Sequence, residues 1–306
     1  MSTLKEMGEH EVVRRLTARL GAHAELMTGA GDDCAVVRLA DSPIDQVYTT
    51  DPLVEGVHFK AGEKSERVGN KAAGRVLSDL AAMGAHPRWL LVNVVAPADQ
   101  QFEDLENIYK GMNALCARFG AVIIGGDVAR GPVLELHLFG IGELPAGTAL
   151  LRSGARPGDE IFVSGPLGCS IEGRHLDFTP RVEEGIFLRE SGMVHALIDV
   201  SDGVATDLRH ILKQSATGAL LDADLIPCNG TLENALYDGE DFELLGTVAP
   251  DASEMLRLKY AERFGSELTV IGRMTGEAGV LKLRDGKGVR TLEAKAFEHF
   301  KNVPEP

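Results

Sequence analysis

Aspartates beside glycine, serine or threonine recur along this chain, at positions that read as strand ends or helix starts. Clustered carboxylates are hard oxygen ligands, which suit magnesium rather than zinc. The pattern therefore predicts a metal-rich site for phosphates. The six places are Gly31-Asp32-Asp33, Thr49-Thr50-Asp51, Ser78-Asp79, Gly125-Gly126-Asp127, Asp199 and Ser201-Asp202-Gly203.

Two of these acidic motifs, Gly31-Asp32-Asp33 and Thr49-Thr50-Asp51, flank neighbouring predicted strands. Taken alone, the first is more often a solvated turn, and the second could simply end a strand. A strand of about six residues joins them, so a hairpin would bring their carboxylates together. Such a like-charged pair is unfavourable unless a metal lies between its members, which favours the metal interpretation.

The Ser78-Asp79 pair falls in the C-terminal half of a predicted helix, between apolar residues. A surface polar pair is the alternative, but a buried aspartate needs hydrogen bonds or a cation, so the context favours a functional role. Gly125-Gly126-Asp127 is predicted to follow a short buried strand, in a turn where glycines let backbone N–H groups approach a phosphate. A plain turn fits that motif equally well.

Several other polar residues are less informative by themselves. Ser201 or Asp202 could be the N-cap of a helix that begins at residue 204. Arg152 could supply a phosphate-binding guanidinium or be an ordinary surface arginine. His58 and Glu240 are isolated, and an isolated histidine is most often structural or exposed to solvent.

The composition is that of an ordinary globular protein, with 306 residues, 44% hydrophobic and 25% charged. This length predicts two domains with separate cores. The net charge of −15 disfavours a surface for nucleic acid or anionic membrane, since either would repel it. An acidic protein that handles nucleotides must neutralise their phosphates locally, and bound divalent metal does so.

The cysteines are far apart in sequence and form no close pair of the zinc-binding or redox kind. Without a secretory signal, reduced thiols in a cytosol are expected. No stretch approaches the ~20 apolar residues of a membrane helix, so a cytoplasmic location is predicted. The four cysteines are Cys34, Cys116, Cys169 and Cys228.

Strand-like and helix-like segments alternate irregularly, and some strands are hairpin-like neighbours, which favours an α+β fold. Proline and glycine accumulate at residues 145–159, which predicts a boundary between domains at 1–145 and 146–306. Strands are predicted at 34–39, 46–50, 89–96, 121–124, 133–141, 160–164, 195–200, 219–223, 242–248, 268–273 and 280–284. Helices are predicted at 12–20, 66–83, 102–119, 181–190, 204–214, 232–236 and 252–264.

With these residues assembled, the sequence resembles thiamine-monophosphate kinases, members of the superfamily that includes aminoimidazole ribonucleotide synthetase. Seven segments keep the family's order between residues 29 and 245, and together they are highly specific. The ending AFEHF, residues 296–300, resembles the family's aromatic ending. The seven segments are GAGDDCAVV, TTDPLVEGVHF, LSDLAAMGAHPRWLL, IIGGDVARGP, LRSGARPGD, IDVSDGVATDLRHI and DGEDFELL.

The resemblance implies transfer of the ATP γ-phosphoryl group to thiamine monophosphate, with ATP as co-substrate and several Mg²⁺ ions. The implied magnesium ligands are Asp33, Thr49, Thr50, Asp51, Asp79, Asp127, Asp199 and Asp202. The implied ATP contacts are Gly126, Asp127, Arg152 and Ser201, and the implied catalytic residues are Arg152 and Asp202. The residues implied to face the thiamine phosphate are His58, Glu240 and Phe297.

The resemblance also implies two α+β domains, an N-terminal mixed sheet with helices followed by a C-terminal α+β domain, and a homodimer joined through the N-terminal sheets. The chain departs from the family pattern at Pro52, at Asp238 and in a segment between residues 165 and 181 that is shorter than usual. Pro52 removes one backbone donor beside the metal loop.

Three alternatives remain open at this stage. Selenophosphate synthetase should carry a reactive N-terminal cysteine, whereas the earliest cysteine here is Cys34. The hydrogenase-maturation protein of the superfamily should end in a cysteine-bearing tail, and this chain ends Val303-Pro304-Glu305-Pro306. A non-catalytic ATP and magnesium sensor would need fewer carboxylates than the sequence offers.

Overall fold

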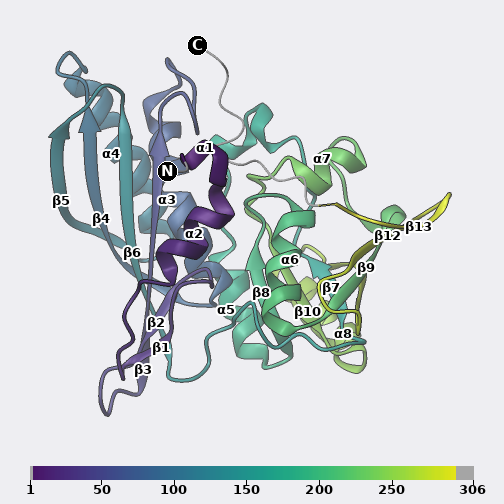
Figure 1. The fold of residues 1–306 in the computed structure, drawn as a ribbon. Coiled ribbons are helices and arrows are strands. Elements are labelled where there is room, and N and C mark those ends of the chain that lie inside the picture. The colour runs from purple at the N-terminus through teal and green to yellow at the C-terminus, as the bar shows by residue number, and fades with distance from the viewer. Residues whose placement is uncertain (1–2, 294–306) are drawn as a thin grey trace.

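The computed structural model describes residues 3–293 of the chain. Phe297, which the resemblance assigns to the acceptor, therefore lies outside the described residues. Within this range the chain forms two mixed β-sheets side by side, each with helices packed on it (Figure 1). The predicted α+β fold is confirmed.

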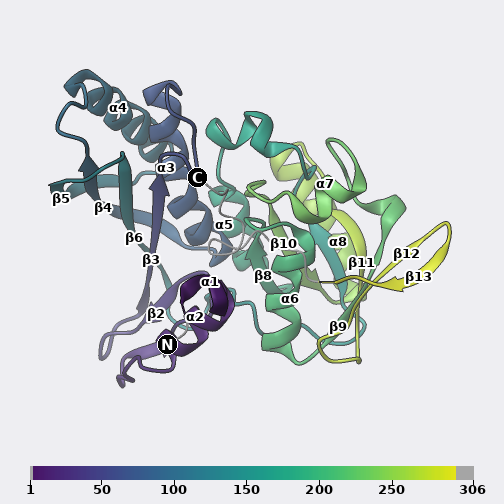
Figure 2. The ribbon, with the colours of Figure 1, turned by 45° about the horizontal axis from the view of Figure 1, so that its top comes forward.

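The first sheet has the strand order β1-β2-β3-β6-β4-β5, in which β4 and β5 are parallel and the other neighbours antiparallel. Helices α3 and α4 pack against each other on one face of this sheet (Figure 2). The strands are β1 (Leu26–Thr28), β2 (Ala35–Val37), β3 (Ile44–Val54), β4 (His86–Ala96), β5 (Val122–Arg130) and β6 (Glu135–Pro145). The helices are α1 (Leu4–Met7), α2 (Glu9–Thr17), α3 (Ser65–Ala82) and α4 (Phe102–Arg118).

The second sheet has the order β13-β12-β9-β11-β7-β10-β8, with β9 and β12 parallel and the other pairs antiparallel. Its strands are β7 (Glu160–Val163), β8 (Val194–Asp199), β9 (Gly218–Asp222), β10 (Leu244–Val248), β11 (Thr269–Thr275), β12 (Leu281–Asp285) and β13 (Gly288–Thr291). The helices of this half are α5 (Val182–Ser191), α6 (Val204–Ser215), α7 (Leu232–Tyr237) and α8 (Pro250–Phe264), with 3₁₀ turns η1 (Ser170–Glu172), η2 (Arg174–Leu176) and η3 (Ala223–Leu225).

Two strands run further than the sequence predicts. Asp51 and Pro52 lie within β3 rather than after it, and Pro52 is accommodated beyond the end of β2, where one edge of β3 has no partner strand. The Gly125-Gly126-Asp127 motif lies within β5 rather than in a turn. The strand at 121–124 was expected to be buried, but β5 is an edge strand and most of its residues are exposed.

The two halves share an apolar core. One cluster of buried side chains extends from α3 to residues of the second sheet, such as Phe162 and Leu197. Helices α3 and α5 approach closely at Gly185, where a Cβ atom would lie 2.0 Å from the Ala81 carbonyl oxygen. A second cluster of buried side chains lies within the C-terminal half alone. The expectation of two separate cores is therefore only partly met, because there are two cores but the first is shared by both halves. The boundary at residue 145 stays a prediction.

Among residues 3–293, no helix combines the length and the apolar character that a membrane crossing requires.

Candidate active site

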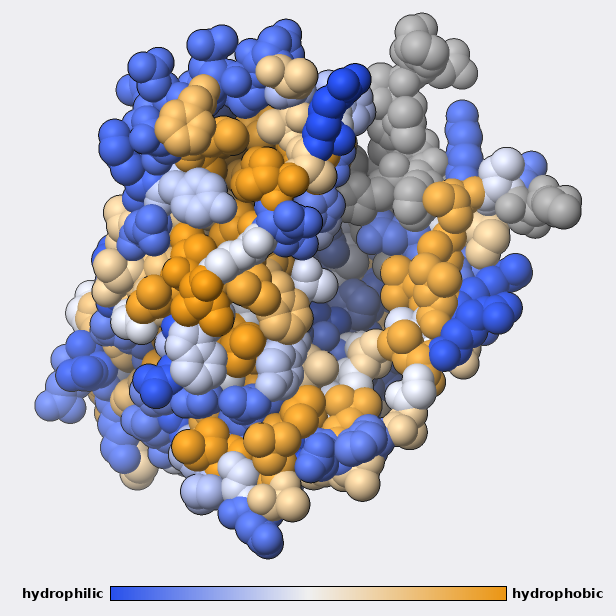
Figure 3. All heavy atoms as spheres, turned by 90° about the vertical axis from the view of Figure 1, so that its left-hand side faces the viewer, coloured by the Kyte–Doolittle hydropathy of each residue, from blue (hydrophilic) through white to orange (hydrophobic). Residues whose placement is uncertain are grey.

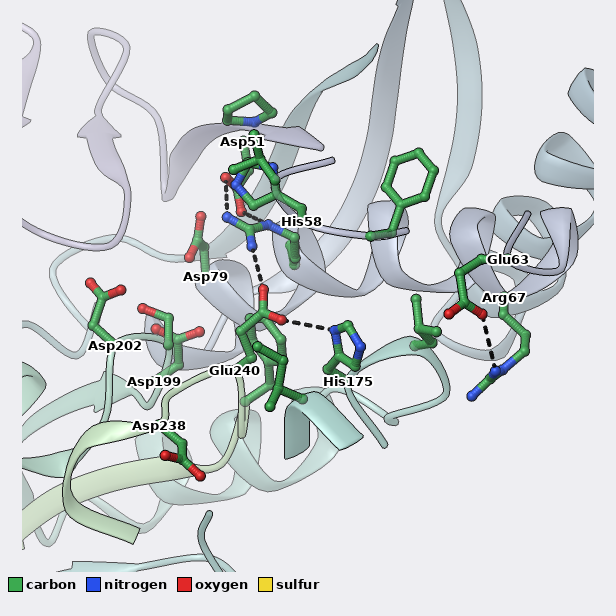
Figure 4. Close-up of a pocket in the computed structure, with 18 of the residues that line it drawn as sticks. Asp51, His58, Glu63, Arg67, Asp79, His175, Asp199, Asp202, Asp238 and Glu240 are labelled. Carbon is green, nitrogen blue, oxygen red and sulfur yellow. Dashed lines mark hydrogen bonds and ion pairs between the residues drawn. The ribbon is translucent and has the colours of Figure 1, made fainter. Parts of the chain in front are cut away.

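A cavity of about 900 Å³ lies between the two halves of the molecule (Figure 4). It brings together most of the residues that the sequence singles out, although they are far apart along the chain. Gly126 and Asp127 do not line it. The predicted residues that do are Asp33, Thr49, Thr50, Asp51, His58, Asp79, Arg152, Asp199, Ser201, Asp202 and Glu240.

Three carboxylates, which we call the carboxylate triad, meet at one end of this cavity. They are Asp33 before β2, Asp79 in α3 and Asp199 at the end of β8, and each offers an oxygen within 4.8 Å of the others. Asp33 and Asp199 are buried and Asp79 is partly buried. Segments from both halves of the chain are thus needed to assemble the triad.

The triad is only partly satisfied by hydrogen bonds. Thr49 Oγ1 donates to Asp79 and Ser78 Oγ donates to Asp199, each at 2.5 Å. Arg152 Nη2 donates to Asp33 Oδ1 at 2.5 Å. The second oxygen of Asp33, Oδ2, is buried and has no hydrogen-bond partner among the described residues. A buried carboxylate oxygen without a partner is costly, and here it belongs to a cluster that suits a cation.

Burial and mutual repulsion disfavour the charged forms of these carboxylates. Burial first, and then the charge of Asp33, raise the pKa of Asp199 to about 7, although Ser78 opposes the shift. Burial and the neighbouring carboxylates of Asp199 and Asp51 raise the pKa of Asp79 well above its ordinary value. A divalent cation bound among hard oxygen ligands would relieve this repulsion. The donor set therefore fits magnesium.

Three further predicted metal ligands, Asp51, Thr50 and Asp202, line the cavity outside the triad. Asp51 forms a two-pronged ion pair with Arg75, at 2.6 and 2.7 Å. Thr50 lines the cavity, but its hydroxyl donates to the Leu138 carbonyl oxygen at 2.9 Å. Asp202 lines the cavity close to Asp199 (Figure 4). All three border the space beside the triad.

The expected N-cap role of Ser201 or Asp202 is wrong. The N-cap of α6 is Gly203, which makes no side-chain cap. Asp207, in the first turn of α6, instead accepts from the backbone N–H groups of Ser201 and Asp202, at 3.1 and 3.0 Å. Gly203, the residue before α6, has a φ of 92°, which favours glycine. With the chain in this conformation, the Asp207 carboxylate reaches the N–H groups of residues that precede the helix. Neither Ser201 nor Asp202 therefore supplies a side-chain cap to α6.

Asp127 lies on the exposed strand β5, away from the residues that line the cavity. Its Oδ1 accepts from the backbone N–H of Val128 at 2.9 Å. At Gly126, a Cβ atom would fall 1.8 Å from the Val92 carbonyl oxygen, so close strand packing requires glycine there. The structure therefore explains Gly126 by packing and does not bring Asp127 to the triad.

A second polar group, which we call the lysine network, borders the cavity away from the triad. It comprises Lys71, Arg75, His175 and Glu240. Glu240 Oε2 lies 2.7 Å from Lys71 Nζ and 2.8 Å from His175 Nδ1, and Glu240 Oε1 lies 3.2 Å from an Arg75 nitrogen. Burial alone would raise the pKa of Glu240, but His175, Lys71 and Arg75 lower it to about 2. Glu240 is therefore ionised.

His58 is fixed beside this network by the backbone. Its Nδ1 accepts from the Val54 N–H at 3.0 Å, so the other ring nitrogen carries the proton of the neutral form. Its carbonyl oxygen accepts from Lys71 Nζ at 2.5 Å. His58 and Glu240, which the resemblance places on the acceptor, thus share Lys71 as a hydrogen-bond donor.

Sequence reasoning missed three residues of this network: Lys71, Arg75 and His175. The first two had a signal, because Arg67, Lys71, Arg75 and Asp79 follow one another at intervals of four and so share one face of α3. A polar stripe in an otherwise alanine-rich buried helix indicates a functional face. His175 had no such signal, since it lies in an irregular segment.

Comparisons with known proteins agree with this geometry. The family model for the N-terminal domain of AIR synthase related protein matches residues 31–144, and the model for its C-terminal domain matches residues 156–283. The thiamine-monophosphate kinase of Rhodopirellula baltica is 36% identical over 90% of this chain and 92% of its own length. The one from Salmonella typhimurium is 36% identical over 96% and 98%.

A solved structure gives the same result in three dimensions. The structure of AaThiL complexed with AMPPCP and TMP is 27% identical, with a TM-score of 0.83 over 98% of this chain and 99% of that one. Agreement in sequence and in fold extends over both halves. The chain belongs to the thiamine-monophosphate kinase family of AIR synthase related proteins.

Proposed function

We propose that this protein transfers the γ-phosphoryl group of ATP to thiamine monophosphate, giving thiamine diphosphate and ADP. The observation that carries the proposal is the carboxylate triad, assembled from both halves in a cavity of about 900 Å³. Relatives named as thiamine-monophosphate kinases match 90% or more of the chain. A relative of the same fold was solved with AMPPCP and TMP.

We assign the metal-binding role to the residues that the sequence predicts. Magnesium bound there would offset the charge of two phosphates and hold the reacting oxygens in line. The buried, unpartnered oxygen of Asp33 and the raised pKa of Asp199 support this assignment. The proposed ligands are Asp33, Thr49, Thr50, Asp51, Asp79, Asp127, Asp199 and Asp202.

The assignments of Arg152, Ser201 and Asp202 rest on their position in the cavity, and the remaining ones rest on the resemblance. Arg152 enters the cavity beside Asp33 and is proposed to contact ATP phosphates, together with Ser201. Arg152 and Asp202 are proposed as catalytic residues because both border the space beside the triad. Gly126 and Asp127 stay proposed ATP contacts, and His58, Glu240 and Phe297 stay proposed acceptor contacts.

The chemistry needs positioning more than proton transfer. The attacking group is a phosphate oxygen, which is already ionised near neutral pH, so no strong general base is required. Arg152 supplies a fixed positive charge whose guanidinium matches phosphate geometry. Both anions must be brought together in one enclosed space, and the cavity between the two halves provides it.

A homodimer joined through the first sheet is part of the proposal. Apolar side chains gather on the face of this sheet that α3 and α4 leave uncovered (Figure 3). On β5, Val122, Ile124 and Val128 are 57%, 56% and 72% exposed. Contiguous exposed apolar surface marks an interaction site. A measurement of the mass of the protein in solution checks the dimer. The cytoplasmic location stays a prediction from the sequence.

The deciding experiment mixes the purified protein with ATP, Mg²⁺ and thiamine monophosphate and separates the products by chromatography. Thiamine diphosphate and ADP should appear in equal amounts. If neither forms while ATP still binds, the protein is a nucleotide sensor and the proposal is wrong. If product forms only with another phosphorylated alcohol, the protein is still an ATP-dependent kinase but its acceptor is not thiamine monophosphate.

A further inference from the structure

Lys71 is a lysine with no exposed surface, in the middle of α3. Its Nζ lies 2.5 Å from the His58 carbonyl oxygen, 2.6 Å from His175 Nδ1 and 2.7 Å from Glu240 Oε2. Burial lowers the pKa of this lysine, although the charge of Glu240 opposes the shift. A buried charge of this kind is retained only where its partners are fixed around it.

The three partners come from separate segments that meet at one end of the cavity. His58 follows β3, His175 lies in η2, and Glu240 lies in the loop before β10. All three line the cavity, whereas Lys71 itself lies behind them and does not. Lys71 therefore cannot touch a bound acceptor and can act only through its partners.

The Glu240 loop has a conformation that needs such support. Glu240 and Phe242 adopt φ values of 54° and 52°, a region that side-chain-bearing residues rarely occupy. The Glu240 backbone N–H donates to the Ser201 carbonyl oxygen at 2.7 Å, which joins the loop to the region of the triad. A strained loop persists where its surroundings hold it in place, and Lys71 supplies a charged contact to its side chain.

The 165–181 segment also docks on α3 through contacts other than the one between Lys71 and His175. Arg67, one turn earlier, pairs with Asp177 at 2.5 Å and donates to the Gly173 carbonyl oxygen at 3.0 Å. Asn70 donates to the carbonyl oxygens of Leu176 and Phe178, at 3.1 and 3.2 Å. What Lys71 alone provides on this helix face is a joint contact to His58 and Glu240.

We propose that Lys71 is a positioning residue for acceptor recognition, which fixes the Glu240 carboxylate and the His58 loop at the cavity end away from the carboxylate triad. The proposal rests on the proposed transfer to thiamine monophosphate. It adds Lys71, a residue that lies behind the cavity wall and makes no contact with substrate. On this proposal Lys71 acts mainly on binding of the acceptor, because its side-chain hydrogen bonds go to His58, His175 and Glu240 and not to the triad or Arg152.

The test compares steady-state kinetics of the unsubstituted protein and Lys71→Met, with both substrates varied. The KM for thiamine monophosphate should rise about tenfold or more, as expected for loss of a buried charged hydrogen bond, and the KM for ATP should change less than about twofold. The matched control is Asp177→Asn, which weakens another contact between α3 and the same segment. It should leave both KM values unchanged.

A double-mutant cycle separates positioning from general destabilisation. If Lys71 acts through Glu240, adding Lys71→Met to Glu240→Gln should raise the acceptor KM little further than Glu240→Gln alone. Additive effects, or an acceptor KM that Lys71→Met leaves unchanged, would overturn the positioning role. Should Lys71→Met not fold, Lys71→Gln serves the same comparison. Absence of turnover in the unsubstituted protein would instead overturn the proposed function, and this inference with it.

Discussion

The two ends of the cavity use carboxylates in opposite ways. At the triad, Asp33, Asp79 and Asp199 crowd together, and burial and repulsion raise the pKa of Asp199 to about 7. In the lysine network, Glu240 is surrounded by Lys71, Arg75 and His175, which lower its pKa to about 2. The first end has an excess of negative charge, and the second is internally paired.

This difference shows what each end lacks. Burial and repulsion oppose full ionisation of the triad, and cations from outside the chain would relieve that repulsion, which fits the metal-binding role that we propose. The charges of the lysine network are paired with one another within the chain, and such preorganisation fits the proposed role in acceptor recognition. Arg75, a member of the lysine network, connects it to Asp51 beside the triad, because it pairs with both Asp51 and Glu240.

The largest expected effect comes from removing a charge of the triad. Asp79→Asn should reduce kcat by about 10³-fold or more, because a metal ligand and its charge are lost from a site that works by electrostatics. The same change should raise the metal-free unfolding temperature or leave it unchanged, since it relieves repulsion. Kinetics and thermal unfolding with chelator check both. Loss of activity together with a lowered unfolding temperature would indicate a merely structural role.

Asp127→Asn tests whether the metal site extends beyond the cavity of one chain. We expect turnover to be abolished with the fold intact, as for a triad aspartate, although Asp127 is exposed on β5. Circular dichroism establishes the fold and the product assay measures turnover. Near-normal activity would refute the role assigned to Asp127 and restrict the metal site to the triad and its neighbours.

A smaller effect is expected from pH on the metal-free protein. An aspartate has an unfolded pKa near 3.9, and that of folded Asp199 is about 7, so the folded state holds its proton more tightly. The contribution of Asp199 to the free energy of unfolding is therefore fully present below about pH 4, and it is lost as pH rises through about 7. Glu240 does not offset this, because its folded pKa of about 2 affects stability only below about pH 4.

Magnesium should therefore raise the unfolding temperature more at pH 8 than at pH 5, because it binds the ionised triad. The gain is on the order of a few kcal/mol in unfolding free energy. Differential scanning calorimetry with and without Mg²⁺ at both pH values checks this. If Mg²⁺ raised the unfolding temperature equally at both pH values, or more at pH 5, it would be stabilising the protein at a site other than the triad.

The smallest effect is expected at the rim, where Arg67 pairs with Asp177, whose side chain is 56% exposed. Exposed ion pairs contribute up to about 1 kcal/mol. Asp177→Asn should change the unfolding free energy by less than this in urea titrations, and less still at high salt. A loss of several kcal/mol would show that the rim, rather than the lysine network, holds the 165–181 segment in place.

The resemblance to the family predicts that Asp33, Asp79 and Asp199 share one site, whereas local pattern joins only the loops of Asp33 and Asp51. Local pattern does predict the helices α3 and α4 well, since alanine-rich and apolar periodic stretches leave few alternatives. The extent of β3 and β5 is mispredicted, because proline and paired glycines normally end strands. Here an unpaired edge tolerates Pro52, and close packing on Val92 requires Gly126.

The contacts of the lysine network could not be predicted from local sequence pattern. Its contacts join Lys71 to His175 and Glu240, which are 104 and 169 residues away, and only the packed structure sets those distances. Local pattern could have flagged the α3 stripe of Lys71 and Arg75, but not its partners. The shared core between the halves is likewise a tertiary result, since it depends on the close approach of α3 and α5 at Gly185.

The central claim is that the triad gathers divalent cations between ATP and the acceptor. The most direct measurement is a crystal structure with Mn²⁺ in place of Mg²⁺ and a non-hydrolysable ATP analogue, in which anomalous scattering locates the metal. We predict manganese bonded to oxygens of Asp33, Asp79 and Asp199 and to phosphate oxygens of the nucleotide. Nucleotide in the cavity with no metal at these carboxylates would contradict the account.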